Sequence, residues 1–387
     1  MYRGNGSEWK KTIAIRQRRS SANFMPKKSK KFIFLLSFLA LLVLFLPIEA
    51  HSDPFISPET EIAMGKAADE QISQQYGIYQ DKELQLYVNG IGQNLVSKLS
   101  DKVFPRYYFR IVDSSEINAF ALPGGYVYVT LGLMAMVNSE AELAGVLGHE
   151  IGHIIFHHGA KQMVRSIGAQ ILSLGGAIAS PQNAGQWLAV SSALSQQILM
   201  GYGREAEIES DEHGILNGRE AGYSPFGMSE FLKSLRRKEI MSGQSYHSFQ
   251  ATHPDTRDRM VQASLLAERM SNEPESANRY RDRYLNRIRG LKYEGQKHGE
   301  DKKRYKPQYI DVYEVKKGDT FQSIAEKELG DKQKDLDISV MNGRKESSQP
   351  KPGELLKIVR EGKFKKDKFL HIKPDTGRDS GLNSNPK

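Results

Sequence analysis

The sequence predicts an α+β fold that is mostly helical, with one small antiparallel sheet and a small βααβ module near the C-terminus. Apolar residues recur at helical spacing in most segments between residues 59 and 270, whereas β-rich segments are confined to residues 107–130. Residues 309–360 regain apolar periodicity after a charged stretch, which indicates a second, smaller unit. A chain of 387 residues with 39% hydrophobic residues is long enough for two or three packed domains.

The N-terminal 50 residues combine positive charge with an apolar run. They carry 10 basic and 2 acidic side chains, and a run of 15 residues from Phe32 to Leu46, apolar apart from one serine, precedes the small residue Ala50. This layout predicts a signal peptide over residues 25–50, with Met25 as the start and residues 1–24 as a non-native extension. An uncleaved N-terminal anchor is the alternative, but the run is shorter than the ~20 residues that a spanning helix needs.

Charge and cysteine content exclude several classes of protein. Residues 51–290 carry 22 basic and 27 acidic side chains, so the predicted main domain is acidic. A nucleic-acid-binding protein concentrates positive charge on its folded domain, and we therefore expect no nucleic-acid partner. The chain has no cysteine, which excludes disulfides and thiolate metal sites. Any metal must be held by histidine and carboxylate side chains.

The first elements predicted are two helices and three strands. Apolar residues repeat at helical spacing between residues 59 and 100, and this repeat predicts the two helices. Strands are predicted over residues 107–112, 118–122 and 126–130. The last two strands flank Pro123-Gly124-Gly125, a strong turn signal. We therefore expect these strands to form the small antiparallel sheet.

Helices dominate the rest of the main domain. Ser139 followed by Glu142 is a capping-box pattern, which predicts a helix from this point to about His158. Further helices are predicted over residues 204–221, 225–241 and 255–270. Residues 163–200 are apolar and poor in charge, which indicates packed core, a mobile cover over a cleft or a membrane-facing surface. Beyond the leader, no uninterrupted apolar run reaches 18 residues.

The candidate metal site begins with the sequence HEIGH at His149 to His153. Residues four apart share one face of a helix, so both histidines can bind a single ion. Glu150 lies beside that face, where it can take a proton from metal-bound water. Nitrogen ligands of this kind favour zinc, and we expect one zinc ion per chain. The alternative is a structural helix with two surface histidines; His157 and His158 receive no role.

A catalytic zinc site needs a third protein ligand and keeps one position open. Glu207 is the best candidate, because it lies on the predicted helix over residues 204–221. Asp211 shares its face four residues later and is placed to orient a ligand histidine from behind. Glu205 and Glu209 compete with Glu207 for the metal, and spacing alone does not exclude them.

Together these motifs resemble the metalloprotease family that includes the CAAX prenyl protease and the bacterial proteins HtpX, BepA and LoiP. That family pairs HExxH with a later ExxxD, matched here by Glu207 and Asp211. The resemblance also covers residues 118–130 and 252–259. It implies a zincin-like (gluzincin) protease domain over residues 51–290. It further implies hydrolysis of peptide bonds in misfolded or misassembled cell-envelope proteins.

The same resemblance implies roles for four further residues. In the family, the strand matched here by residues 118–122 forms the edge of the cleft on which a peptide substrate lies. A later histidine and arginine act at the substrate carbonyl or regulate the metal. These roles are carried over to Asn118 and Ala119, which would bind substrate, and to His253 and Arg259, with Arg257 as an alternative to Arg259.

The C-terminal unit, residues 309–360, resembles a LysM module. The resemblance rests on residues 312–325, on Met341-Asn342-Gly343 and on residues 351–359. It implies binding to the N-acetylglucosamine-containing glycan of cell walls, with a structural or protein-docking role as the alternative. Residues 291–308 are predicted to be a charged linker. Residues 361–387 are predicted to be a disordered tail.

The predicted leader and the resemblance together place the protein outside the cytoplasm, in the periplasm after signal-peptide cleavage. Expected partners are polypeptide substrates of the envelope, peptidoglycan through the LysM-like module and, peripherally, the membrane surface. Two other functions stay open. One is a wall-binding scaffold or chaperone with a latent metal site, and the other is a hydrolase of wall peptides.

Overall fold

The computed structural model describes residues 57–167, 201–242, 247–254, 256–271, 277–293, 307–344 and 348–365. The predicted extension, signal peptide and most of the predicted tail lie outside the described residues, as does most of the apolar stretch 163–200. The predicted mostly helical α+β composition with small sheets is confirmed. Within the part of the chain that is described, no helix has both the length and the apolar character to cross a membrane.

Two N-terminal helices begin where side chains cap them. Helix α2 spans Pro58–Tyr76, and the Ser57 side chain accepts a hydrogen bond from the Thr60 amide. Helix α3 spans Lys82–Ser97 and is capped in the same way by Asp81. Each cap satisfies a backbone N–H that has no partner within its helix.

The first sheet contains β1 (Tyr108–Val112), β2 (Ala119–Leu122) and β3 (Tyr126–Thr130). The expected hairpin between β2 and β3 forms around Gly124 and Gly125, whose φ angles of 78° and 94° favour glycine. The expectation of a purely antiparallel sheet is wrong, because β1 pairs in parallel with β3. The strand order β1-β3-β2 leaves β2 at an edge of this sheet.

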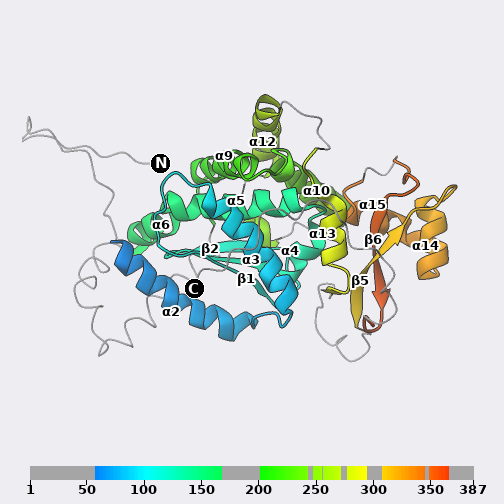
Figure 1. Cartoon of the computed structure of the whole chain (residues 1–387), viewed down its shortest axis with the longest axis horizontal. Helices are drawn as coiled ribbons and strands as arrows, with labels where there is room; N and C mark the ends of the chain where they lie inside the picture. Colours follow the sequence, from blue (N-terminus) through cyan, green and yellow to red (C-terminus); the bar gives the residue numbers. More distant parts are fainter. Residues whose placement is uncertain are drawn as a thin grey trace, which may run out of the picture. The chain divides into compact units, whose positions relative to one another are not determined.

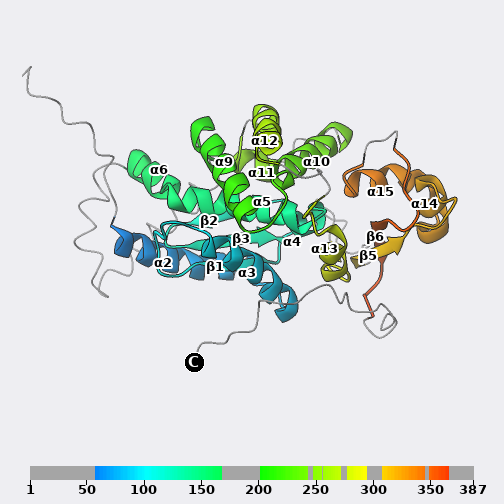
Figure 2. The same ribbon diagram turned by 45° about the horizontal axis from the view of Figure 1, so that its top comes forward.

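Helices cover both faces of the sheet. On one face, Ile111, Ala119 and Val129 are buried in one apolar cluster with residues of α3 and of α5 (Glu140–Ile155). On the other face, Phe120 and Tyr128 pack with Met64 and its neighbours on α2. Figures 1 and 2 show the sheet among these helices. Because successive side chains of a strand point to opposite faces of the sheet, the sheet separates these two apolar clusters.

Helix α5 follows α4 (Leu131–Met136) and is buried over almost its whole length. The Ser139 side chain accepts from the Glu142 amide at 3.1 Å, as the capping pattern predicts, while the Glu142 carboxylate accepts from the Asn138 amide. The helix ends at Ile155, three residues before the predicted end. His157 has a left-handed φ of 53°, which breaks the helix and leads into α6 (His158–Ile167).

The longer of the later helices agree with the predicted segments. Those that match are α9 (Arg204–Glu220), α10 (Gly227–Ser242) and α12 (Thr256–Met270). Two short helices, α11 (His247–Thr252) and α13 (Arg281–Arg287), lie outside the predicted segments. Gly222, with a φ of 86°, follows the end of α9, as expected for a residue that terminates a helix. In Figure 1, α9 lies next to α5 and α12, and contacts join α9 to both helices.

The C-terminal module has the expected order of elements. It contains β5 (Gln308–Glu314), α14 (Phe321–Leu329), a short 3₁₀ helix (Lys332–Lys334), α15 (Asp335–Met341) and β6 (Leu355–Glu361). A further strand, β4 (Lys292–Tyr293), pairs with β5, so the first residues of the predicted linker belong to this sheet. All strand pairs in the sheet are antiparallel.

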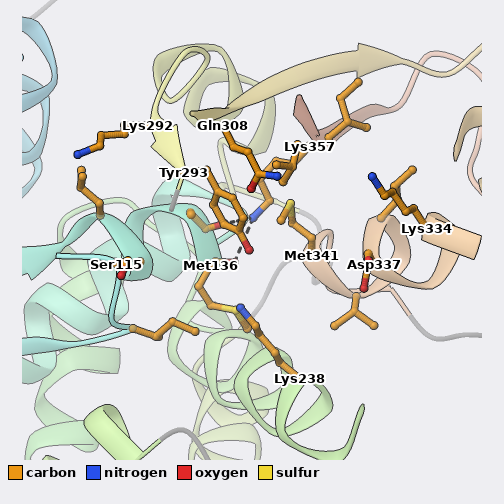
Figure 3. A pocket seen from close by; sticks show the side chains of 18 of the residues that line it. Ser115, Met136, Lys238, Lys292, Tyr293, Gln308, Lys334, Asp337, Met341 and Lys357 are labelled. Carbon is orange, nitrogen blue, oxygen red and sulfur yellow. Dashed lines mark hydrogen bonds between the residues drawn. The ribbon is translucent and has the colours of Figure 1, made fainter. Parts of the chain in front are cut away.

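One buried lysine joins the module to the protein's main body. Lys357, on β6, is fully buried. Its Nζ donates to the carbonyl oxygens of Ala135, Met136 and Val137 at 2.7, 3.1 and 2.9 Å (Figure 3). These carbonyls are at the C-terminal end of α4, where a positive charge is favourable. The module is therefore docked on α4 through a buried polar contact.

Candidate metal centre

Close contact between α5 and α9 brings the predicted residues together. A Cβ atom at Gly148 would lie 2.9 Å from the Cα of Gly214, and one at Gly152 would lie 3.0 Å from the Cα of Ser210. Only glycine permits so close an approach. Each of these glycines directly precedes one of the two histidines on α5. The close approach of the helices therefore brings His149 and His153 to the carboxylates of α9.

Four buried side chains form one cluster of donor atoms. The Nε2 atoms of His149 and His153 are 3.0 Å apart. The Glu207 carboxylate lies 3.5 Å from His149 Nε2 and 3.4 Å from His153 Nε2. Nδ1 of His253 is 3.2 Å from His149 Nε2. The structure thus gathers His253 with the three predicted ligands, within 4.8 Å of one another.

Of the three glutamates that compete on α9, only Glu207 enters the cluster. Its side chain is fully buried, whereas Glu205 is exposed. The Glu209 carboxylate is 51% exposed and lies 3.1 Å from His158 Nε2. Helix rotation explains the difference, because residues two positions apart point to different sides of a helix.

Asp211 contacts one histidine of the cluster from behind, as expected. Its Oδ1 lies 2.8 Å from His149 Nδ1. Arg259 donates two hydrogen bonds to the same carboxylate, at 2.7 and 2.8 Å. Burial by itself would raise the pKa of Asp211, but the Arg259 charge and these hydrogen bonds lower it below its ordinary value. Asp211 therefore remains an ionised acceptor that fixes the orientation of the His149 ring.

Arg259 is completely buried behind the cluster. Besides Asp211, its Nη1 reaches Glu207 Oε2 at 2.5 Å and donates to the His253 carbonyl at 3.3 Å. The alternative residue, Arg257, is exposed. Arg259 was expected at the substrate carbonyl or at the metal. In the structure its donors are directed at the two carboxylates and at the backbone that carries His253.

Glu150 is buried and has no hydrogen-bond partner for either carboxylate oxygen among the described residues. Its Oε1 lies 3.4 Å from His253 Nε2. Burial raises the pKa of Glu150, and the nearby histidines lower it less than burial raises it. A buried carboxylate without partners is costly, so the surroundings of Glu150 suit a further polar group between it and the cluster.

The donor set fits a zinc ion. Ligand atoms at about 2.0–2.1 Å from zinc in a tetrahedron are about 3.3 Å apart. The nitrogen–nitrogen and nitrogen–oxygen separations of 3.0, 3.4 and 3.5 Å among the predicted ligands are close to that value. Two imidazoles and a carboxylate, with no thiolate, are also a donor set of catalytic zinc sites.

The predicted substrate-binding residues lie at the start of the edge strand, beside the cluster: Asn118 directly precedes β2, and Ala119 is its first residue. Asn118 is buried, and its Oδ1 accepts a hydrogen bond from the Thr252 hydroxyl at 3.1 Å. The Ala119 carbonyl is 3.2 Å from His253 Nε2. The His253 ring therefore bridges the donor cluster and the edge of β2.

Sequence reasoning missed Tyr202. Its ring stacks on the His153 ring with centroids 4.0 Å apart, and its amide donates to the Thr252 carbonyl. Burial raises the pKa of its hydroxyl, so the ring acts as a neutral packing surface. The flanking glycines at 201 and 203 were the one available signal, since Gly201 has a φ of 74°.

A cavity of about 780 Å³ lies elsewhere, where the C-terminal module meets the main body. Met136, Lys238, Tyr293, Met341 and Lys357 are among its lining residues (Figure 3). No residue of the donor cluster lines it. The cavity and the metal centre are therefore separate features.

Helices that carry HExxH and a later glutamate around one buried cluster define a metalloendopeptidase class of site. Residues 82–267 match the family model described as Peptidase family M48. The match runs from α3 to α12 and includes every residue of the donor cluster. It agrees with the predicted metalloendopeptidase class.

Similar proteins include bacterial and mitochondrial peptidases. The Beta-barrel assembly-enhancing protease of Yersinia pestis is 28% identical over 283 residues, 70% of this chain and 55% of the relative. That of Escherichia coli K12 is 29% identical over 242 residues, covering 60% and 48%. Human mitochondrial metalloendopeptidase OMA1 is 28% identical over 188 residues, covering 44% and 36%. The matched region spans about half or less of these relatives.

Proposed function

We propose that this protein is an exported, zinc-dependent endopeptidase that hydrolyses peptide bonds in polypeptides of the bacterial cell envelope. The observation that carries the proposal is the buried Glu150, whose carboxylate has no hydrogen-bond partner among the described residues, beside the donors of His149, His153 and Glu207. The names of the bacterial relatives, beta-barrel assembly-enhancing proteases, favour a role in the quality control of outer-membrane protein assembly.

His149, His153 and Glu207 would hold the ion. Zinc bound there would polarise the substrate carbonyl and lower the pKa of a bound water. Glu150 accepts the proton that the attacking water loses, and its carboxyl group then delivers this proton to the leaving amine. Burial raises the pKa of Glu150, which makes its carboxylate a stronger base for the proton of the attacking water.

A peptide substrate would extend the first sheet at β2. As an edge strand of the described sheet, β2 can pair through its main chain with an extended peptide, a common mode of recognition. The Ala119 carbonyl is the nearest such acceptor to the donor cluster. Substrate binding at this carbonyl requires that His253 release it.

His253 has a position suited to latency. Its Nδ1 lies among the metal donors and its Nε2 lies 3.2 Å from the Ala119 carbonyl, so one ring occupies a ligand position and a substrate position. We propose that this arrangement keeps the enzyme inactive until the ring moves away. In the displaced position, His253 would stabilise the oxyanion that forms as water attacks the carbonyl.

Localisation and the C-terminal module complete the proposal. Residues 25–50 would direct export to the periplasm, leaving a mature N-terminus near His51, which sequencing of the exported form tests. Residues 309–360 would act as a LysM-like module that binds wall glycan or docks a protein. The order of strand, helix, helix and strand supports this likeness.

Substitution of Glu150 tests the function directly. Glu150→Gln should keep one zinc ion per chain and lose casein cleavage by several orders of magnitude, since only the proton acceptor is removed. Purified peptidoglycan offered in parallel should not be hydrolysed. Cleavage of peptidoglycan alone would indicate a wall hydrolase. A protein that cleaves neither substrate, both as the wild type and as His253→Ala, would indicate a scaffold with a latent metal site.

A further inference from the structure

The two histidines of the HExxH motif are supported differently from behind. His149 Nδ1 lies 2.8 Å from the Asp211 carboxylate, a direct contact. His153 Nδ1 instead lies 2.9 Å from Nδ1 of His158, with the Ser210 hydroxyl at 3.2 Å. His158 Nε2 in turn lies 3.1 Å from the Glu209 carboxylate. His153 thus reaches a carboxylate only through a second imidazole.

One placement of protons satisfies this chain of contacts, in which the Ser210 hydroxyl lies 3.2 Å from His153 Nδ1 and 3.4 Å from His158 Nδ1. If His153 Nε2 is to face the metal, the proton of that ring must be on Nδ1, which then donates. His158 Nδ1 accepts that hydrogen bond only when it carries no proton, so the proton of His158 is on Nε2. That Nε2–H donates to Glu209 Oε2. Each protonated ring nitrogen then faces an acceptor, and the unprotonated Nδ1 of His158 faces a donor.

Local backbone geometry explains how His158 comes to lie behind His153. The left-handed conformation of His157 ends α5 and begins α6 at His158. This turn brings the His158 ring back to the helix it has just left, with 5.0 Å between the centroids of His158 and His153. The chain accepts an uncommon conformation at a residue other than glycine, which is typical of functional sites.

We propose that His158 and Glu209 are positioning residues that hold the metal-binding nitrogen of His153 toward the ion. The inference rests on the proposed function, because it assigns a task to residues behind a zinc ligand. It gives a role to His158, which received none from the sequence, and to Glu209, which the sequence offered as a competing metal ligand. Outer partners of metal-bound histidines typically change metal affinity by about 10–100-fold, because they fix the tautomer and orientation of the ring.

Zinc affinity, measured by competition with a chelator, tests the relay without relying on catalysis. His158→Leu should weaken zinc binding about 10–100-fold. His158→Asn should recover part of this loss, because its amide oxygen can take the place of Nδ1 as acceptor. Glu209→Gln should cause a smaller loss, since the amide oxygen remains a weaker acceptor. Ser210→Ala should leave affinity near the wild-type value.

Matched variants separate the relay from general effects on folding. His213→Leu removes another histidine that contacts α5, through the Gly148 carbonyl, and Glu205→Gln removes an exposed carboxylate of α9. Both should bind zinc as the wild type does. Equal affinity for His158→Leu and the wild type, or a loss confined to Ser210→Ala, would overturn the relay.

Nitrogen-15 NMR of the zinc-loaded wild type needs no variant and covers the case in which His158→Leu does not fold. We expect His158 as the tautomer protonated on Nε2 and His153 protonated on Nδ1. A His158 ring protonated on Nδ1 would contradict the relay while leaving the proposed protease intact. A wild-type chain that takes up no zinc would instead contradict the proposed function, and the relay with it.

Discussion

At the scale of single residues, the site depends on how Glu207 is held. Its two carboxylate oxygens lie near positive or donating groups, Arg259 Nη1 at 2.5 Å and His253 Nδ1 at 3.1 Å. Burial would raise the pKa of Glu207, but the charges of His253 and Arg259 lower it well below its usual range. The carboxylate therefore remains ionised, as a metal ligand must.

Zinc content measures the contribution of Glu207. Glu207→Ala should lower the zinc content of the purified protein well below one per chain, because the third ligand is lost. Glu205→Ala serves as the control, since its side chain is exposed and lies outside both the cluster and the contacts behind His153. Glu205→Ala should keep its zinc, while Glu209→Ala should remain loaded when zinc is in excess. A Glu207→Ala protein with full zinc occupancy would show that another group completes the site.

Activity of His253→Ala distinguishes latency from oxyanion stabilisation. Under latency, basal casein cleavage should rise, by about tenfold if nine tenths of the molecules are closed, with self-cleavage during expression. If His253 acts mainly on the oxyanion, kcat should instead fall by about 10²–10³ at unchanged zinc content. His213→Ala is the control. An unchanged His253→Ala enzyme would leave the residue with a structural role alone.

Spacing in the sequence was sufficient for part of this site. His149, Glu150 and His153 follow from helix geometry, because positions four apart must share a face. The choice of Glu207 over its neighbours did not follow, since the rotation of α9 toward α5 is set by packing. The proximity of His158 to His153 depends on the left-handed backbone at His157, which no helical pattern predicts.

At the scale of elements, the contact between α5 and α9 places the ligands. Gly148 and Gly214 remove the side chains that would separate the two backbones. The capped α5 then presents its histidines to the acidic face of α9. Close packing of this kind leaves no room for an added methyl group.

Adding that methyl group tests the contact. Gly148→Ala should destabilise the protein by about 1–3 kcal/mol through overpacking and weaken zinc binding, because its Cβ would meet the Gly214 backbone at 2.9 Å. Gly218 lies on α9, as Gly214 does, but a Cβ added there would have no atom within 4 Å. Gly218→Ala should therefore stabilise the protein by about 0.4–1 kcal/mol. Chemical denaturation and chelator competition measure both effects. Similar stability changes in the two variants would argue against a special contact.

The first sheet shows what element patterns leave open. The turn at Gly124 and Gly125 specified the hairpin of β2 and β3 in advance, because a tight turn joins neighbouring antiparallel strands. The position of β1 depended on a longer connection, residues 113–117, which allows either direction of pairing. Its pairing with β3 leaves β2 at an edge of the sheet in the described part of the chain, where we propose that a peptide pairs.

At the scale of the whole molecule, the C-terminal module is part of the structure that supports α4 and α5. Lys357 donates to three carbonyls at the end of α4, and Asn342 accepts from both the Lys357 amide and Arg281. Arg281 also donates to the Asn138 carbonyl, just before α5 begins. The charged composition of residues 291–308 predicted only a linker, and not that the module docks on α4.

Replacement of Lys357 tests how firmly the module is joined. Lys357→Met should lower the free energy of unfolding by more than about 2 kcal/mol, because each buried carbonyl left without a donor costs about 1–3 kcal/mol. Lys351→Met, at an exposed position in the same module, should change stability by less than about 0.5 kcal/mol. Thermal and denaturant unfolding compare the two. Equal stabilities would mean that the module docks only loosely.

The sequence by itself determined the local features of this protein: the helix caps, the β2–β3 turn, the HExxH face and the order of elements in the C-terminal module. These depend on residues a few positions apart, where backbone geometry alone fixes which side chains meet. Only the tertiary structure decided that Glu207 joins the cluster, that Arg259 stands behind it and that Lys357 anchors the module. Each of these depends on contacts between distant segments, and close packing in the folded chain settles which of many compatible pairings forms.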